Sequence, residues 1–248
     1  MAILAANWKM YKTIAEARAW FGAVAGSPLL GRAQVVVFPP LTALCALRDH
    51  AGQIALGAQD VAWADEGAFT GMVSAGQLRD AGCRYALVAH SERRRYAGDN
   101  DELAARKIAA LWRAGLTPVY CVGEDAGERG AGQGPACIRA QVDTVLDALS
   151  GVLGGELVIA YEPVWAIGSG APATPAQAGD AAALIRERVR ERCGPQALGH
   201  LSLLYGGSTS AASVPGFMAE PLVDGLLVGS ASLDPSSFLA MLEVMVDA

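Results

Sequence analysis

A carboxylate, an imidazole and a cation each follow a short apolar run of the chain. Glu162 directly follows LVIAY, His90 lies two residues beyond YALV, and Lys9 lies three residues beyond ILAA. A carboxylate between a buried run and an apolar loop costs free energy unless it is paired or functional. A single lysine is usually solvated and a single histidine usually structural. The three residues therefore indicate acid–base chemistry only if the fold brings them together.

Glycine-bearing turns follow two further apolar runs near the C-terminus. Gly206-Gly207-Ser208 follows LSLLY, and Gly229-Ser230 follows LLV. A loop without Cβ atoms can direct its backbone N–H groups at a phosphate. Paired glycines alone mark turns of every kind. Together with a cation, these turns indicate an anionic ligand.

Eight short, mostly apolar runs recur along the chain and predict β-strands. Because polar residues hardly alternate with apolar ones within them, we expect parallel strands that are covered on both faces. The runs are Ile3–Ala6, Val35–Phe38, Ile54–Ala58, Tyr85–Val88, Pro118–Val122, Leu157–Tyr161, Leu201–Tyr205 and Leu226–Val228.

Helix-like segments lie between these runs, among them Asp101–Ala114, Ile138–Leu149 and Thr174–Cys193, the last with a threonine cap followed by proline. Eight βα units in about 250 residues predict an α/β fold of the (β/α)8 barrel type, with residues 1–248 as a single domain. The main rival is a doubly wound open sheet, which often carries G-x-G-x-x-G after its first strand. This chain has NWKM there instead. In a barrel, functional residues lie at the carboxyl ends of the strands.

Composition and charge argue against several classes of protein. The chain is 52% hydrophobic and carries a net charge of −6, so it can form a large core but offers no basic surface for nucleic acid. No apolar run is long enough to cross a membrane and no signal peptide is apparent, so we expect no membrane partner and a cytoplasmic location. Five scattered cysteines without a CxxC pair argue against a disulfide framework and a metal site.

Seven ordered motifs resemble the triosephosphate isomerase family over essentially the whole chain. They are NWKM at 7–10, GAFTG at 67–71, HSERR at 90–94, CVGE at 121–124, YEPVWAIGSG at 161–170, YGGS at 205–208 and LVGSAS at 227–232. The resemblance implies interconversion of dihydroxyacetone phosphate and D-glyceraldehyde 3-phosphate through an enediol(ate). It also implies a phosphorylated triose as substrate, no cofactor, no metal, and a homodimer.

The resemblance also implies a role for each catalytic residue. Glu162 is similar to the family's base, His90 to its neutral electrophile and Lys9 to its stabilising cation. Asn7 resembles the residue that places Lys9, and Glu92 resembles the acid that organises Lys9 and the later proton transfers. Cys121 resembles a residue that supports Glu162 from the neighbouring strand.

A lid over the substrate is a further implication, because a phosphorylated enediolate left in water would eliminate its phosphate. The lid residues are Pro163, Trp165, Ile167, Gly170 and Pro172, and the phosphate-holding residues are Gly168, Ser208, Gly229 and Ser230.

Several positions depart from the common family pattern. Ala89 and Ser230 stand where glycine is frequent. The alanine is expected to be absorbed by packing, and the serine to be strained only if its φ is positive. Met72 stands where the family usually has a glutamate. In the family, that glutamate resembles a partner for an arginine of the SERR run across the dimer interface. A less salt-sensitive dimer is expected, with Thr70 reaching the partner's site. Pro172 is expected to stiffen the second lid hinge.

Two alternatives remain at this point. An isomerase of a related ketose phosphate, such as erythrulose phosphate, would share Lys9, His90 and Glu162 and differ in the room beneath the lid. A non-catalytic barrel that senses a metabolite would be expected to lack at least one of these three residues, and all three are present.

Overall fold

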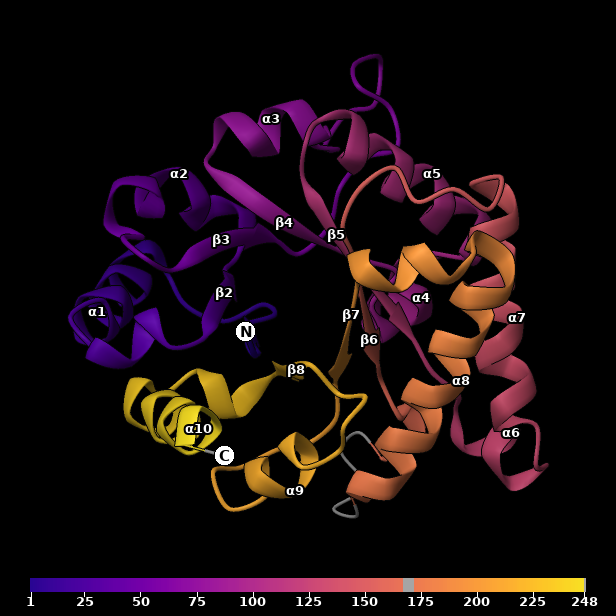
Figure 1. Cartoon of the computed structure of the whole chain (residues 1–248). Coiled ribbons are helices and arrows are strands. Elements are labelled where there is room, and N and C mark those ends of the chain that lie inside the picture. Colours follow the sequence, from indigo (N-terminus) through magenta and orange to yellow (C-terminus); the bar gives the residue numbers. More distant parts are fainter. Residues whose placement is uncertain (167–171, 248) are drawn as a thin grey trace.

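Eight parallel strands form a closed barrel in this computed structural model, which describes residues 1–166 and 172–247 (Figure 1). The strands are paired in chain order, and β8 completes the ring by pairing with β1. Their bounds are β1 (Ile3–Asn7), β2 (Gln34–Phe38), β3 (Ala55–Ala58), β4 (Cys83–Val88), β5 (Thr117–Val122), β6 (Leu157–Tyr161), β7 (Leu201–Tyr205) and β8 (Gly225–Val228).

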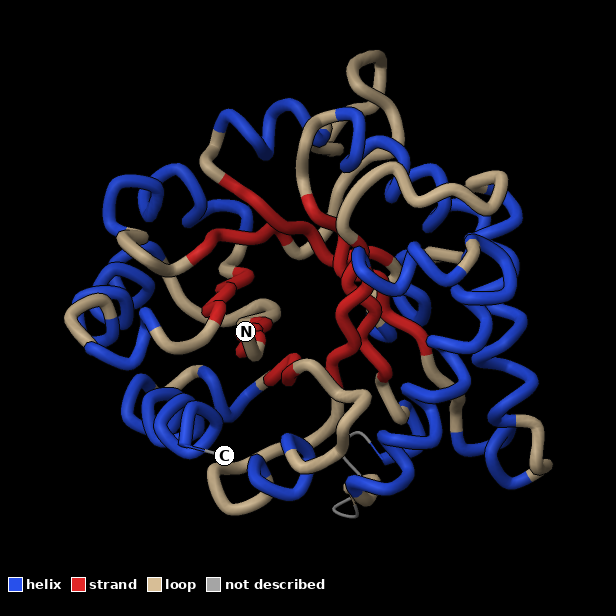
Figure 2. The backbone as a smooth tube through the Cα atoms, in the orientation of Figure 1, coloured by secondary structure: helices blue, strands red, loops and turns tan. Residues whose placement is uncertain are grey.

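Helices surround the barrel on its outer side (Figure 2). The α-helices are α1 (Ile14–Val24), α2 (Leu44–Leu47), α3 (Ala75–Asp80), α4 (Ser91–Ala97), α5 (Asp101–Arg113), α6 (Ala126–Gly130), α7 (Gly134–Ala148), α8 (Pro175–Cys193), α9 (Val214–Met218) and α10 (Pro235–Asp247). Short 3-10 helices are η1 (Pro28–Gly31), η2 (Leu41–Ala43), η3 (Arg48–His50), η4 (Val164–Ala166), η5 (Pro195–His200) and η6 (Ser230–Ser232).

Alternation along the strands separates two apolar layers. Ile3 and Ala5 belong to the cluster that fills the barrel, whereas Leu4 and Ala6 belong to the larger cluster beneath the helices. Side chains on a strand point alternately to its two faces. The row of interior residues on β1 therefore continues to Asn7, at the mouth of the barrel. Likewise, the interior residues Val158 and Ala160 of β6 are continued by Glu162.

The predicted (β/α)8 barrel is confirmed. The bounds of β6 and β7 agree with the sequence prediction, and the other strands differ by one or two residues at an end. The helix predicted over Ile138–Leu149 begins earlier, at Gly134, because Pro135 suits the first turn of a helix although it breaks the apolar periodicity. Thr174 caps α8 as predicted and forms a capping box with Gln177.

Within the described ranges, no helix is long and apolar enough to cross a membrane. The five cysteines are all free thiols. Over the same residues, no group of three or more His, Cys, Asp or Glu side chains could hold a metal ion.

Candidate active site

A cavity of about 320 Å³ opens at the carboxyl ends of the strands. The ends of β1 and β8 line it together with the segments that follow β1, β4, β6, β7 and β8, so five parts of the chain meet there. Seven predicted site residues lie in its wall: Asn7, Lys9, His90, Glu162, Ser208, Gly229 and Ser230. The cavity therefore brings the predicted acid–base residues and the predicted phosphate-binding turns together.

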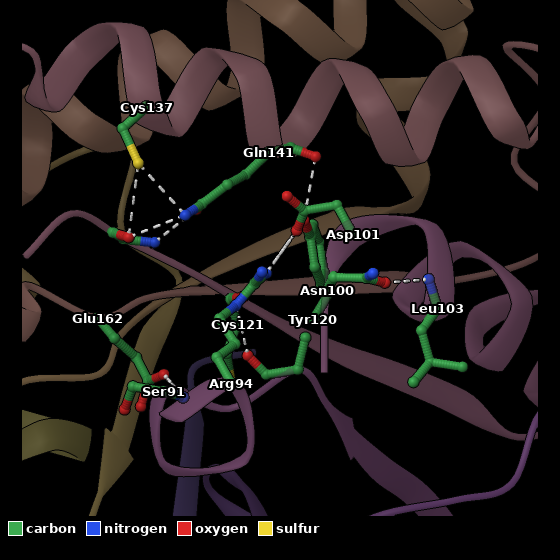
Figure 3. Close-up of polar contacts among 12 residues, drawn as sticks. Ser91, Arg94, Asn100, Asp101, Leu103, Tyr120, Cys121, Cys137, Gln141 and Glu162 are labelled. Carbon is green, nitrogen blue, oxygen red and sulfur yellow. Dashed lines mark hydrogen bonds and ion pairs between the residues drawn. The ribbon is translucent and has the colours of Figure 1, made fainter. Parts of the chain in front are cut away.

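Glu162 is a buried carboxylate whose two oxygens both have partners. Its Oε1 lies 2.8 Å from Nε2 of His90. Its Oε2 accepts the backbone N–H of Ser91 at 2.8 Å (Figure 3). Burial alone raises the pKa of this carboxyl, but the contacts with His90 and Ser91 and the charge of Lys9 lower it more. The pKa of Glu162 is therefore below its usual value. The carboxylate is ionised although only 2% of the residue is exposed.

His90 caps the first turn of α4, and two contacts act on its imidazole in opposite directions. Burial lowers the imidazole pKa, but the charge and hydrogen bond of Glu162 raise it above its usual value. On the other side, Nδ1 accepts the N–H of Glu92 at 3.2 Å. A nitrogen that accepts an N–H carries no proton, so this bond favours the neutral imidazole with its proton on Nε2, directed at Glu162. We assign that neutral form.

Lys9 is held in a left-handed backbone conformation, with φ of +52°. For a residue with a Cβ atom this conformation costs about 1–2 kcal/mol. Two hydrogen bonds hold the Lys9 backbone: Asn7 Oδ1 accepts its N–H at 3.0 Å, and Gln59 Nε2 donates to its carbonyl oxygen at 2.8 Å. A third holds its side chain, because Lys9 Nζ donates to Glu92 at 2.7 Å. The predicted roles of Asn7 and Glu92 in placing Lys9 therefore have a geometric basis.

Two glycines allow the chain to approach Glu162 closely. A Cβ on Gly123, just after β5, would lie 1.7 Å from the carbonyl oxygen of Glu162. A Cβ on Gly206, just after β7, would lie 3.0 Å from Cγ of Glu162. Any larger residue at either position would displace the base.

The predicted phosphate side of the cavity consists of small residues. Ser208 and Ser230 are exposed, and Gly229 precedes the 3-10 helix η6. Among the described residues other than glycine, positive φ occurs at Lys9, Lys12, Ala89 and Ser150. Ser230 therefore has an ordinary backbone, and its side chain adds no strain. Gly168 lies outside the described residues.

The segment predicted to form the first lid hinge contacts a buried carboxylate. Trp165 of η4 donates its Nε1–H to Oε1 of Glu124 at 2.8 Å, and the hydroxyl of Tyr161 donates to the same oxygen at 3.0 Å. The guanidinium of Arg129 lies 3.9 Å from the centre of the Trp165 ring. Pro163 is buried and Pro172 is exposed. The predicted lid residues Ile167 and Gly170 lie outside the described residues.

Cys121 is buried beside Glu162, as the resemblance implies. Burial and the charge of Glu162 raise the pKa of this thiol well above its usual value, so it stays protonated. Its predicted support of Glu162 stays a prediction.

The sequence analysis left three residues behind the site unassigned. Gln59 holds the Lys9 turn, and Glu124 contacts Trp165 in the predicted lid hinge. Arg94 contacts the carbonyl of Ala89, just before His90, and the carbonyl of Cys121 on β5. Gln59 and Glu124 do follow strands, which is the available signal, but neither residue type indicates such a role by itself.

The loop between β3 and α3 projects beyond the helices (Figure 1). Thr70 lies on it in an exposed position, with Met72 48% exposed beside it. Arg93 pairs with Asp60 at 2.9 Å and with Asp99 at 3.4 Å in the same chain. This arginine is thus neutralised without an acid at position 72.

Comparisons with known proteins agree with this geometry. The sequence model of the triosephosphate isomerase family matches residues 2–245. Among curated proteins named triosephosphate isomerase, the one from Moorella thermoacetica is 45% identical over 243 residues, covering 96% of each chain. That from Roseiflexus castenholzii is 44% identical over 246 residues, covering 98% of this chain and 97% of its own. That from Halorhodospira halophila is 46% identical over 240 residues, covering 96% of each chain.

Proposed function

Because the chain belongs to the triosephosphate isomerase family, we propose that it interconverts dihydroxyacetone phosphate and D-glyceraldehyde 3-phosphate by proton transfer through an enediol(ate). The observation that carries this proposal is the contact between Glu162 and His90 beside Lys9 in one cavity. These are a base, a hydrogen-bond donor for a carbonyl oxygen and a cation for the charge that develops on that oxygen.

Entry of the substrate changes the partners of Glu162 and His90. In the structure, Nε2–H of His90 is directed at Glu162. A substrate whose carbonyl oxygen accepts that proton separates the pair. Glu162 then loses contacts that lower its pKa, so it becomes a stronger base, while His90 loses the contact that raises its own pKa. The same displacement therefore strengthens the base and keeps the electrophile neutral.

The proton transfers follow from these positions. Glu162 removes a proton from the carbon next to the carbonyl, and the electron pair moves onto the carbonyl oxygen. His90 Nε2–H and the ammonium of Lys9 stabilise that oxygen. His90 gives its Nε2 proton to that oxygen and takes the proton of the hydroxyl on the adjacent carbon, so the negative charge passes to the second oxygen. The protonated Glu162 then returns its proton to the former carbonyl carbon, and the second oxygen becomes the new carbonyl oxygen. Asn7 and Glu92 hold Lys9 in place.

The substrate phosphate is proposed to lie against the other wall, near Ser208, Gly229 and Ser230, and Gly168 is the fourth residue proposed to bind it. Lys9, which lines the cavity, supplies a positive charge that attracts the phosphate. Closure of the lid over this group would exclude water and protect the enediolate from losing phosphate. The Trp165–Glu124 contact supports a hinge at the first end of the lid.

A coupled assay with D-glyceraldehyde 3-phosphate tests this function. The wild-type chain should turn over rapidly, and Glu162→Gln should lower kcat by roughly 10²–10⁴-fold because a general base is removed. Glu220→Gln, on an acid outside the cavity, is the matched control and should keep full activity. A wild-type rate near background would refute the activity, and higher turnover of erythrulose phosphate in the same assay would move the assignment to a four-carbon substrate.

A homodimer is the proposed assembly. A second hollow of about 210 Å³ opens beside the mouth and is lined by Asn7, Lys9, Gln59, Glu92 and Tyr96 among others. Tyr96 is 74% exposed there, and Phe69 on the projecting loop is 42% exposed. Insertion of this loop into the hollow of a second copy would cover both and bring Thr70 close to Asn7 and Lys9.

Sedimentation velocity at micromolar concentration tests the dimer. We expect a dimer that persists in about 0.5 M salt, where exposed ion pairs are largely screened, because Met72 brings no charge to the interface. Met72→Lys should favour the monomer, whereas Val152→Lys, at an exposed position in the loop before β6, should leave the dimer intact. A monomeric wild-type chain would refute the proposed assembly.

A further inference from the structure

The alternation of side chains along β4 is interrupted just before the site. Leu87 belongs to the cluster inside the barrel and Val88 to the cluster outside it. Continued alternation would direct Ala89 inward and His90 outward. Instead, Ala89 has φ of +54° and its side chain joins the outer cluster, while His90 lines the cavity. A left-handed turn at an alanine therefore directs the imidazole into the site.

This turn is unfavourable for a residue with a Cβ atom, so its surroundings must hold it. Arg94, one turn into α4, donates its Nε–H to the carbonyl oxygen of Ala89 at 3.0 Å. The bond reaches the strained residue directly. Packing alone does not replace it, because a buried carbonyl also needs a donor.

The same guanidinium reaches a second strand. Its Nη2 donates to the carbonyl oxygen of Cys121 on β5 at 3.1 Å (Figure 3). Cys121 is paired with Ala160 of β6, two residues before Glu162. One planar side chain thus joins the backbone that leads to His90 with the strand beside Glu162.

Arg94 is itself held in place by an ion pair. Its Nη2 lies 2.7 Å from the carboxylate of Asp101 at the start of α5. The hydroxyl of Tyr120 donates to that carboxylate at 2.8 Å (Figure 3). Burial lowers the pKa of the guanidinium, but Tyr120 and Asp101 raise it more, so Arg94 keeps its charge and its donors. It is not among the residues that line the mouth cavity.

We propose that Arg94 is a positioning residue that maintains the left-handed turn at Ala89 and thereby sets the place of the His90 imidazole opposite Glu162. The meaning of this inference for catalysis rests on the proposed isomerase function. Arg94 acts through geometry, since it does not line the cavity in which the reaction is proposed to occur.

Kinetics of Arg94→Lys provide the first test. Lysine keeps the charge opposite Asp101 but lacks the planar fork that reaches two carbonyl groups. We expect kcat to fall by roughly 10–100-fold with little change in KM, because small displacements of a catalytic group have effects of this size. Arg95→Lys, on the next, exposed residue of α4, is the matched control and should leave kcat unchanged. Equal kcat in Arg94→Lys and the parent would overturn the proposal.

Rescue by Ala89→Gly distinguishes positioning from general support of the fold. Glycine adopts positive φ without strain, so the turn should persist without its hydrogen bond. We expect Ala89→Gly alone to change kcat by less than about threefold, and the Arg94→Lys/Ala89→Gly double variant to be at least about fivefold more active than Arg94→Lys. The same loss in both backgrounds would show that Arg94 does not act through Ala89. If Arg94→Lys does not fold, Asp101→Asn loosens the same anchor and should be rescued in the same way.

The position of the imidazole can also be measured without substrate. The chain has three histidines, so the ring nitrogen signals of His90 can be resolved in ¹⁵N NMR spectra. Arg94→Lys should shift them, Arg95→Lys should not, and Ala89→Gly should restore them. If the parent lacks isomerase activity but these shifts occur, the proposed function fails and the positioning role stands. Unshifted signals in Arg94→Lys would refute the positioning role whatever the activity.

Discussion

The two sides of the barrel mouth are built on different principles. After β1, β4 and β6, charged or titratable side chains face the cavity, and each is held by a second group: Lys9 by Glu92, His90 by the Glu92 N–H, and Glu162 by the Ser91 N–H. On the side of β7 and β8, the described residues of the wall are Gly206, Gly207, Ser208, Thr209, Leu227, Val228, Gly229, Ser230 and Ala231, and none of these is ionisable. We call the first side the side-chain half of the mouth and the second side its backbone half.

The difference reflects what each side must do. Acid–base groups need a fixed protonation state and a fixed direction, and both come from hydrogen bonds to neighbouring groups. A phosphate is already charged and needs only N–H donors and room for its oxygens. Gly229 connects the two sides, because a Cβ there would lie 4.0 Å from Nζ of Lys9. Its absence leaves space beside the ammonium.

Removal of the cation from the side-chain half should have the largest effect among the following changes. Lys9→Met removes the charge that stabilises the developing oxyanion, so we expect kcat to fall by about 10²–10³-fold. Lys12→Met, which removes a nearby cation that lies 5.2 Å from the Trp8 ring centre, serves as the control and should cost far less. If steady-state kinetics showed a similar loss of kcat for both variants, the net positive charge near the site, rather than the position of the Lys9 ammonium, would explain the effect.

Crowding of Glu162 by a methyl group at position 206, in the backbone half, should have an intermediate effect on kcat. Gly206→Ala places a methyl group 3.0 Å from Cγ of Glu162 and 3.2 Å from the carbonyl oxygen of Tyr161. The base must shift by a few tenths of an ångström, so we expect kcat to fall roughly tenfold.

Gly199→Ala is the matched control, since a Cβ there has no atom within 4 Å. It should keep wild-type kcat and KM. Wild-type kinetics for Gly206→Ala would show that the two halves tolerate changes independently, contrary to the close approach at Glu162.

The places of the main catalytic residues could be predicted from the sequence, because a polar residue directly after an apolar strand must lie at a strand end. Glu162 and Asn7 also continue the interior rows of β6 and β1. The position of His90 is different. Alternation alone would direct it outward, and the turn that reverses this lies at an alanine whose positive φ leaves no local mark in the sequence.

Contacts between distant segments could not be predicted for the same reason. The Glu124–Trp165 and Arg94–Cys121 bonds join residues 41 and 27 positions apart, and their partners are a ring N–H and a backbone carbonyl. Many residues carry such groups, so their pairing is decided by the packing of helices on the barrel. The expectation that packing would absorb Ala89 therefore missed the strained turn that Arg94 contacts.

A smaller effect is expected in the pH dependence of the free energy of unfolding, to which the Glu162 carboxylate of the side-chain half contributes. Because the pKa of Glu162 is below its usual value of 4.5 in the folded chain, its charge stabilises the fold above that pH. This contribution is lost as the pH falls through the lowered pKa. The Tm of the parent should therefore fall more steeply below pH 4.5 than that of Glu162→Gln, by about 2–4 °C for each kcal/mol lost. Parallel Tm curves, measured by differential scanning calorimetry, would contradict the lowered pKa.

The smallest expected effect tests whether the second half acts through its backbone. Ser230 has an ordinary φ and an exposed side chain, so its N–H rather than its hydroxyl is the group proposed to face the phosphate. Ser230→Ala keeps the N–H, and we expect KM for the triose phosphate to change by less than about twofold, the size of losing a solvated hydroxyl contact. The same measurement on Ser208→Ala extends the test to the turn after β7. A large rise in KM in either variant would show that this half also depends on side chains, and the contrast between the two sides of the mouth would then be one of charge alone.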